Sequence, residues 1–160
     1  MPKRTLTIEY EEYAASADLP QDEQDLLASA QEAREKAYAP YSKFNVGAAV
    51  LTKDGHVLLG SNQETANYKG SCAEKVALDA AGVAGAKGKI LKIAIAGDPE
   101  SPEPITPCGQ CRQDLKEAED LSGEPITIIL GSHEKIMRVV GIDQLLPFAF
   151  GPANLGISVK

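Results

Sequence analysis

The sequence predicts an α/β domain with a mixed sheet and helices on both of its faces. A hairpin signal occurs early in the chain, and apolar, strand-like runs then alternate with helical segments. The length of 160 residues suits one domain with a full core. Hydrophobic content of 43% and charged content of 24% are ordinary for a globular protein, so composition agrees with this fold class.

The first part of the chain is expected to form an extension, residues 1–20, in front of a catalytic domain over residues 21–160. Within the extension, residues 5–10 alternate well enough to predict a short strand. A helix is predicted to begin near Pro20, because proline suits the first helical turn, and to continue until Pro40 ends it. Its apolar face is formed by Leu26, Ala30, Ala33 and Ala37.

A hairpin of strands 46–52 and 56–60 is predicted next, because Asp54-Gly55 between them is a strong turn signal. Residues 90–96 form an apolar strand that only Lys92 interrupts. The remaining elements are predicted as a helix over 72–81, a loop with four prolines over 98–107, a helix over 108–118, strands over 126–130 and 137–141, and a short helix near 142–146.

The three cysteines form the most informative pattern in the chain. Cys72 begins a Cys-Ala-Glu run that ends at Glu74, and Cys108 and Cys111 belong to a Pro-Cys-Gly-Gln-Cys run. A catalytic zinc site uses three protein ligands and leaves the fourth position to water. No fourth cysteine occurs, and both histidines are far along the chain from the two runs. The pattern predicts a catalytic zinc site, with Glu74 placed to move the protons of that water.

Other uses of the cysteines stay open at this point. They could be buried apolar residues, or ligands of a structural zinc completed by a distant histidine. Cys108 and Cys111 could be a redox pair of the thioredoxin kind, but that hypothesis gives Cys72 no role. A disulfide framework is disfavoured because the cysteine count is odd and no secretion signal is visible.

A metal ligand two residues before a Glu, followed by Pro-Cys-x-x-Cys, resembles the signature of zinc nucleoside and nucleobase deaminases. Residues 38–49, 62–68 and 145–152 are similar to segments of the small cytidine deaminases, and the resemblance runs from residue 22 to residue 156. It implies a three-layer fold with a five-stranded core sheet and one Zn²⁺ per chain. It also implies hydrolytic deamination of cytidine and deoxycytidine in pyrimidine salvage, with release of ammonia.

The resemblance assigns substrate contacts to several side chains. Asn62 and Glu64 match ribose-binding positions, for which the alternative is a polar loop after a strand. Phe44 and Phe150 match aromatic positions that pack against the pyrimidine, for which the alternative is core packing, the role expected of Phe148. In the family, the residue matching Phe150 comes from a neighbouring subunit. The resemblance therefore implies a homotetramer with shared active sites.

Backbone groups near Ala73 and Thr106 are implied to contact the base. The sequence departs from the family at Lys75, where an arginine usually hydrogen-bonds the zinc thiolates; Arg112 remains as a second cation. Lysine keeps the charge but lacks the planar fork of arginine. Thr65 stands where asparagine is usual. These departures leave open another substrate, such as a modified cytidine or the aminated analogue blasticidin S.

The formal net charge of −7, without a clear basic cluster, favours a free pyrimidine nucleoside over nucleic acid as substrate. No apolar stretch of about eighteen residues predicts a membrane span, and the N-terminus lacks the core of a signal peptide. With reduced cysteines, these features indicate the cytoplasm. A catalytically silent, nucleoside-binding deaminase-like protein is an alternative, although such a protein would not need Glu74.

Overall fold

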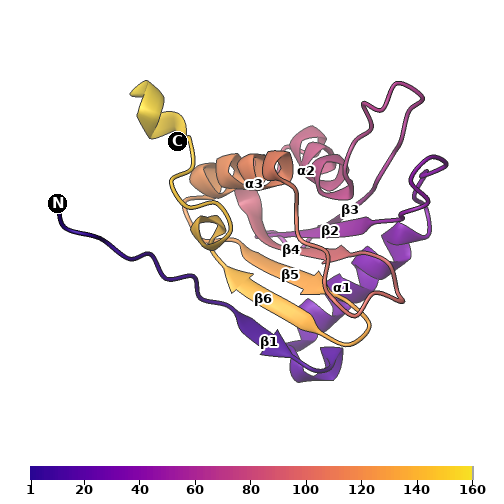
Figure 1. Ribbon diagram of the computed structural model, residues 1–160. Coiled ribbons are helices and arrows are strands. Elements are labelled where there is room, and N and C mark those ends of the chain that lie inside the picture. Colours follow the sequence, from indigo (N-terminus) through magenta and orange to yellow (C-terminus); the bar gives the residue numbers. More distant parts are fainter. Residues whose placement is uncertain (160) are drawn as a thin grey trace.

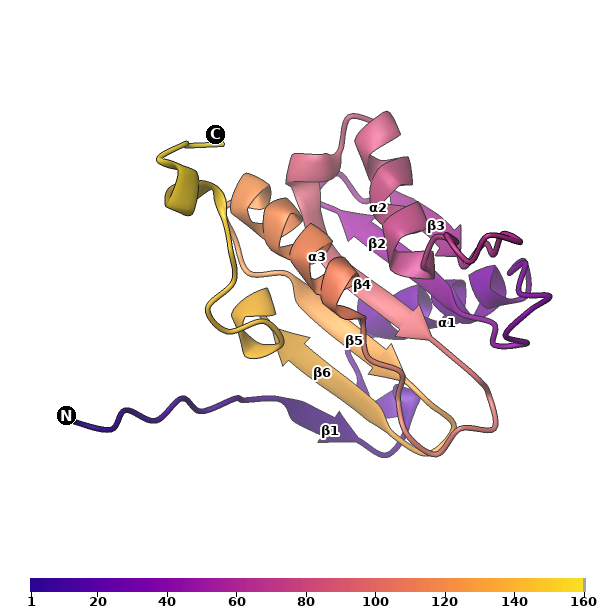
Figure 2. The same ribbon diagram turned by 45° about the horizontal axis from the view of Figure 1, so that its top comes forward.

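The computed structural model describes residues 1–159 and has three layers. A six-stranded sheet lies between helix α1 on one face and helices α2 and α3, side by side, on the other (Figures 1 and 2). The strand order is β1-β6-β5-β4-β2-β3, and β4 and β5 form the parallel pair. The predicted mixed α/β architecture, including an extra N-terminal strand, is confirmed.

The helices and strands agree with the predicted order along the chain. The helices are α1 (Gln21–Arg34), α2 (Ala73–Val83) and α3 (Gly109–Ser122). The strands are β1 (Glu11–Tyr13), β2 (Gly47–Thr52), β3 (Val57–Ser61), β4 (Ile90–Ala96), β5 (Thr127–Gly131) and β6 (Ile136–Val140).

Strand β4 shows how one apolar run serves two cores. Ile93 and Ile95 belong to the core under α2 and α3, whereas Ala94 and Ala96 belong to the core under α1. Successive side chains of a strand point to opposite faces, so a strand covered on both sides is apolar throughout. Lys92, the one charged residue of this run, pairs with Glu23 of α1 at 2.7 Å.

Two glycines allow the helices to approach the sheet closely. A Cβ atom on Gly47 of β2 would lie 2.0 Å from the Ala30 carbonyl oxygen of α1. A Cβ atom on Gly60 of β3 would lie 2.3 Å from the carbonyl oxygen of Ala73, the first residue of α2. Real Cβ contacts are never this short, so each helix sits where it does because its neighbouring strand has glycine there.

The N-terminal strand lies later in the chain than predicted. β1 spans Glu11–Tyr13, and the prediction of a strand over residues 5–10 is wrong. Glu11 bonds to Arg138 of β6 at 2.7 Å, and Tyr13 packs against the core under α1. Residues 5–10 are all exposed. Pairing with β6 therefore begins only where side-chain contacts support it.

Helix α1 also ends earlier than predicted, at Arg34 and not at Pro40. Beyond that point the backbone turns toward the segment after β3. The Tyr38 N–H donates to the Asn62 carbonyl oxygen at 3.0 Å, and the Glu64 N–H donates to the Tyr38 carbonyl oxygen at 2.8 Å. These bonds hold Tyr38 in a short parallel β-bridge with Gln63. They take the place of the helical hydrogen bonds that the apolar periodicity predicted.

The C-terminal part differs from the sequence prediction in two places. The short helix near residues 142–146 is a 3-10 turn over Ile142–Gln144, and a second turn spans Pro152–Leu155. The expected core packing of Phe148 is wrong, because its side chain is 97% exposed and its φ is +59°. Phe148 borders an open surface hollow together with Lys116 and Asp120 and does not enter the core.

Candidate metal centre and substrate pocket

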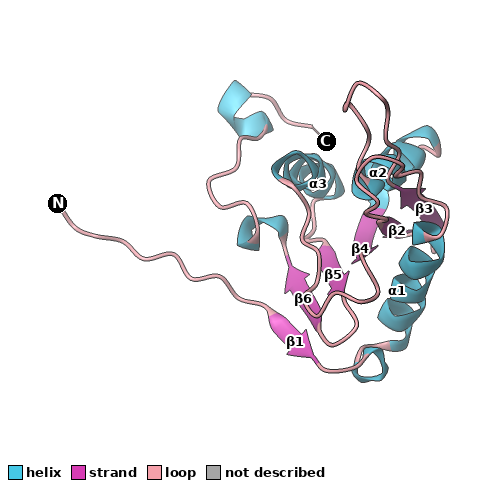
Figure 3. Ribbon diagram, turned by 45° about the vertical axis from the view of Figure 1, so that its right-hand side comes forward, coloured by secondary structure: helices cyan, strands magenta, loops and turns pink. Residues whose placement is uncertain are grey.

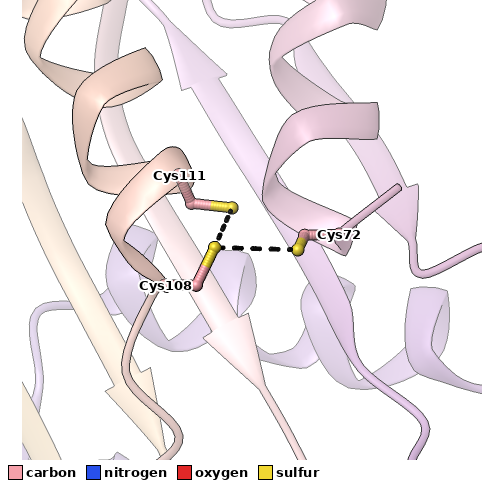
Figure 4. Close-up of side chains that lie close together, drawn as sticks. All are labelled: Cys72, Cys108 and Cys111. Carbon is pink, nitrogen blue, oxygen red and sulfur yellow. Dashed lines mark hydrogen bonds between the residues drawn. The ribbon is translucent and has the colours of Figure 1, made fainter. Parts of the chain in front are cut away.

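The three cysteines converge at the N-termini of α2 and α3. Cys72 is the residue just before α2, Cys108 is the residue just before α3, and Cys111 lies in the first turn of α3. The Cys72 and Cys108 sulfur atoms are 3.9 Å apart, and those of Cys108 and Cys111 are 3.6 Å apart (Figure 4). Backbone N–H groups at helix N-termini stabilise negative charge, which suits thiolates.

These distances fit a zinc ion. Thiolates at about 2.3 Å from a tetrahedral zinc ion lie about 3.8 Å from one another. All three sulfur atoms of Cys72, Cys108 and Cys111 lie within 4.8 Å of one another. Within residues 1–159, this is the one group of three or more His, Cys, Asp or Glu residues whose ligand atoms converge in this way. The donor set is the soft, sulfur-rich type that zinc prefers over harder ions.

The thiols differ in how readily they ionise. Burial raises the pKa of Cys72 and of Cys111, and the nearby Glu74 carboxylate adds to both shifts. A hydrogen bond from the Cys111 backbone lowers the pKa of Cys108. Zinc takes deprotonated sulfur, so metal binding must release the protons of the exposed Cys72 thiol and the buried Cys111 thiol.

Glu74, in the first turn of α2, is buried beside the cysteines. It is 5% exposed, and no ion pair to it is found in the described part of the chain. Burial raises its pKa, and a hydrogen bond with the Cys111 thiol partly opposes that shift. A carboxyl group with a raised pKa can both accept and donate a proton near neutral pH.

A cavity of about 230 Å³ adjoins the cysteine cluster. Its walls include Cys72 and both residues expected to bind ribose, Asn62 and Glu64. Tyr41 and Tyr68 also line it, with ring centroids 5.8 Å apart, and the sequence interpretation gave neither a role. Their positions in the family-like segments 38–49 and 62–68 were the available signal.

Asn62 and Glu64 also hold the loop before β2 in place. The Asn62 side chain accepts from the Val46 N–H at 2.8 Å and donates to the Phe44 carbonyl oxygen at 2.9 Å. The Glu64 carboxylate accepts from the Tyr41 N–H at 2.8 Å. A hydrogen bond from Ser42 holds the pKa of Glu64 below its usual range. A partly exposed carboxylate with a lowered pKa therefore lines the cavity.

The two expected aromatic contacts do not line this cavity. Phe44 is 40% exposed and borders a separate hollow with Asp98 and Pro99. Phe150 is 58% exposed on the C-terminal segment, where its carbonyl oxygen accepts from the Gln113 side chain at 2.8 Å. Neither ring closes the pocket within a single chain.

The remaining expected site residues lie around the metal centre. Ala73 is fully buried as the first residue of α2, and Thr106 is exposed in the loop before Cys108. Lys75 forms an ion pair with Asp79 on its own helix. The Arg112 guanidinium donates to the carbonyl oxygens of Pro107, at 2.8 Å, and Leu145, at 2.7 Å. The two cations are thus bonded to groups other than the thiols, and their action on thiolates stays a prediction.

Gly60 is a positioning residue that the sequence interpretation missed. Its lack of a side chain lets the carbonyl of Ala73, and with it the first turn of α2, lie against β3. That turn carries Glu74 and follows Cys72. The sequence alone gave no signal, because a glycine within a strand is equally consistent with a bulge.

Comparison with known proteins gives one family. The family model described as the cytidine and deoxycytidylate deaminase zinc-binding region matches residues 20–122. The cytidine deaminase of Halalkalibacterium halodurans is 42% identical over 130 residues, 81% of this chain and 94% of that protein. The cytidine deaminase of Mycobacterium tuberculosis strain H37Rv is 39% identical over 134 residues, 81% of this chain and 90% of that protein.

Solved structures agree with these matches. The crystal structure of cytidine deaminase from Burkholderia pseudomallei has a TM-score of 0.71 at 42% identity, covering 82% of this chain and 100% of that one. Cytidine deaminase from Mycobacterium tuberculosis has a TM-score of 0.66 at 33% identity, covering 82% and 99%. The resemblance inferred from the cysteine runs is confirmed, and residues 1–19 lie outside the matched family region.

Proposed function

Because this chain belongs to the cytidine and deoxycytidylate deaminase family, we propose that Glu74 carries the protons in its reaction. That reaction is the zinc-dependent hydrolysis of cytidine to uridine and ammonia, with one zinc ion per chain. The observation that carries the proposal is a buried carboxyl group, without an ion pair in the described residues, beside three converging thiols.

The chain's own residues supply the remaining steps. Cys72, Cys108 and Cys111 would hold the zinc ion, which when bound would lower the pKa of water and so supply a stronger nucleophile at neutral pH. Glu74 accepts a proton from the attacking water and passes it to the pyrimidine ring. A C–O bond forms at the ring carbon that bears the amine. Glu74 then takes the second proton of the water from the new hydroxyl group and gives it to the amine, so that the C–N bond breaks and the oxygen stays on the ring as the carbonyl of uridine. The amine leaves as ammonia, and Glu74 returns to its starting state.

For the substrate site, we propose that Asn62 and Glu64 bind the ribose and that deoxycytidine is a second substrate. An amide and an ionised carboxylate can donate to and accept from a sugar hydroxyl. Both line the cavity beside Cys72. The cavity of about 230 Å³ is smaller than the ~300 Å³ at which ligand pockets usually begin. A wall supplied from outside the chain would account for this.

The need for a further wall supports the proposal of a homotetramer in which neighbouring subunits share active sites. The Phe150 side chain is 58% exposed on the C-terminal segment, and it is absent from the walls of the cavity beside Cys72 in its own chain. We propose that Phe150 packs against a pyrimidine bound to a neighbouring subunit, and that Phe44 contributes from the subunit that binds it. We place residues 1–20 outside the catalytic domain of residues 21–160 and the protein in the cytoplasm.

A substrate panel tests the proposed sugar site. Cytidine and deoxycytidine should release ammonia efficiently, and free cytosine should be a poor substrate, because it lacks the ribose that Asn62 and Glu64 would bind. Ammonia release and uridine formation are measured together. Equal turnover of cytosine and cytidine would contradict the assigned ribose contacts. If the protein preferred another aminated nucleoside, the unusual residues Lys75 and Thr65 would be candidates for determining that preference.

Subunit mixing tests the shared site. Phe150→Ala subunits and Glu74→Gln subunits should each be nearly inactive as pure oligomers. Refolded together, they should regain part of the activity, because some sites combine an intact Glu74 with an intact Phe150 from the next chain. Mass spectrometry of differently labelled chains checks the exchange. Exchange without recovery, or full activity in a monomer, would show that one chain builds each site.

A further inference from the structure

The segment of residues 3–10, called here the N-terminal arm, contributes no residue to the walls of the cavity beside Cys72. It precedes the family match, which begins at residue 20. In the views of Figures 1 and 3 it runs away from the body of the molecule. Within residues 1–159, one side-chain hydrogen bond to the arm is found: the Glu9 N–H donates to the Gln144 side-chain oxygen at 2.8 Å.

The arm has an apolar face that its own chain leaves about half exposed, although Leu6 and Tyr10 each border a surface hollow shared with later residues. Leu6, Ile8 and Tyr10 alternate with polar residues, so they share one face of an extended backbone. Their side chains are 56%, 52% and 51% exposed. The arm also continues β1, an edge strand whose far side has no partner in the described sheet. Unpaired extended backbone with apolar side chains is a template for pairing with another strand.

The charges of the arm point to its partner. The basic residues before β1 are Lys3 and Arg4, whereas the acidic side chains come later, at Glu9 and at Glu11 and Glu12 of β1. Two such segments placed antiparallel bring the basic half of each against the acidic half of the other. Parallel pairing would set like charges side by side, which is unfavourable. The segment is therefore complementary to a second copy of itself.

We propose that the arms of two copies of this chain pair as antiparallel strands about a two-fold axis at Thr7. In this register Leu6 of one copy lies opposite Ile8 of the other, on the same face. Lys3 lies opposite Glu11, whose carboxylate also pairs with Arg138 of its own chain at 2.7 Å, and Arg4 lies opposite the Tyr10 ring, a favourable cation–π arrangement. Such an interface is isologous, the form expected of a two-fold dimer contact. It does not depend on the deaminase chemistry.

Cross-linking of the full-length, zinc-loaded protein tests the axis. Thr7→Cys places two thiols directly opposite each other, within the span of a disulfide. Thr5→Cys is the matched control, because the two Thr5 positions would lie about 14 Å apart, four residues along the strands. Both variants are exposed, and the unmodified chain gives the background from its three native cysteines. Covalent dimers are measured after exposure to oxidised glutathione.

The Thr7→Cys protein should cross-link at least about tenfold faster than the Thr5→Cys protein, because Cα atoms more than about 7 Å apart cannot be bridged. Adding Lys3→Glu and Arg4→Glu to Thr7→Cys should slow the reaction, as should high salt. Equal rates at both positions, or no cross-link at Thr7→Cys, would overturn the proposal. A cross-linking rate that neither the charge reversal nor high salt changes would also overturn the proposal, because the proposed pairing depends on opposite charges.

Discussion

The two faces of the sheet each bury one glutamate, and the two residues do different things. Glu23 is a buried residue of α1, and its carboxylate is bonded by Lys92 of β4 at 2.7 Å and by Arg138 of β6 at 2.9 Å. Glu74 lies on the face of α2 and α3, beside three thiols, with no ion pair found among the described residues. Burial is similar, at 0% and 5% exposed, so the partners make the difference.

Glu23 has a cation on each of its carboxylate oxygens, and these bonds join α1, β4 and β6. Arg138 extends this network to Glu11 of β1 at 2.7 Å, which ties the extra strand to the sheet. A buried carboxyl group without a cation has a raised pKa and is free to change its protonation state. The α1 face therefore contributes stability, and the α2 and α3 face contributes chemistry.

The largest effect is expected from Cys72→Ala. Two remaining thiolates cannot make the three-ligand site, so bound zinc should fall from about one per chain to a small fraction, with loss of activity. Elemental analysis measures the zinc, and Ser71→Ala, at the neighbouring exposed position, is the control that should keep it. Full zinc occupancy in the Cys72→Ala protein would show that the cluster of three cysteines is not the metal centre.

Glu74→Gln separates proton transfer from metal binding. The amide keeps the shape of the side chain but cannot shuttle a proton, so kcat should fall by about 10²–10⁴-fold. Zinc content and unfolding temperature should hold. Glu32→Gln, an exposed change on α1, controls for the loss of one negative charge. A Glu74→Gln protein that kept more than a tenth of its activity, an order-of-magnitude threshold, would exclude this residue as the proton carrier.

Glu23→Ala should show the opposite pattern. Removing the buried partner leaves Lys92 and Arg138 without it, and such a loss costs about 3 kcal/mol of unfolding free energy when the remaining charges can still reach water. Urea denaturation measures this, and activity per folded molecule should be little changed. Asp22→Asn is a matched control, because Asp22 pairs with the same Lys92 but is 52% exposed. It should cost less than about 1 kcal/mol. If Glu23→Ala and Asp22→Asn lowered the unfolding free energy equally, burial would not be the reason that the Glu23 ion pairs stabilise the fold.

The metal centre was predictable because its signals are local. Cys108 and Cys111 are three residues apart at a helix start, and Glu74 is two residues from Cys72, so spacing alone indicates the chemistry. The strand and helix order was predictable for the same reason, since apolar periodicity, glycine and proline act over a few residues. Local pattern does not show that the Cys72 run and the run of Cys108 and Cys111 lie close together, but binding of one metal ion by all three cysteines requires it.

The Glu23 network could not be predicted, because its members are far apart in the sequence. Positions 23, 92 and 138 meet only once the strand order is known, and Lys92 appeared merely as an interruption in an apolar run. The start of β1 and the exposure of Phe148 depended on tertiary contacts in the same way. Local pattern favoured a strand at residues 5–10, but the Glu11 contact with Arg138 decided where pairing begins.

Gly60→Ala is expected to have the smallest effect of these substitutions, and it acts on the face covered by α2 and α3. A Cβ atom there would lie 2.3 Å from the Ala73 carbonyl oxygen and 2.4 Å from the Ala77 nitrogen, so the start of α2 must shift. Forcing atoms into a packed contact costs about 1–3 kcal/mol. Because the displaced turn carries Glu74 and follows Cys72, activity and zinc retention should fall along with stability.

Two controls place this effect on the α2 face. Gly82→Ala, near the end of the same helix, meets nothing within 4 Å and should be neutral or stabilising by up to about 1 kcal/mol. Gly47→Ala makes an equally close contact, 2.0 Å from the Ala30 carbonyl oxygen, but under α1. It should lower the unfolding free energy while leaving zinc content per folded chain unchanged. If Gly47→Ala and Gly60→Ala reduced zinc retention equally, the division between a stabilising face and a chemical face would not hold.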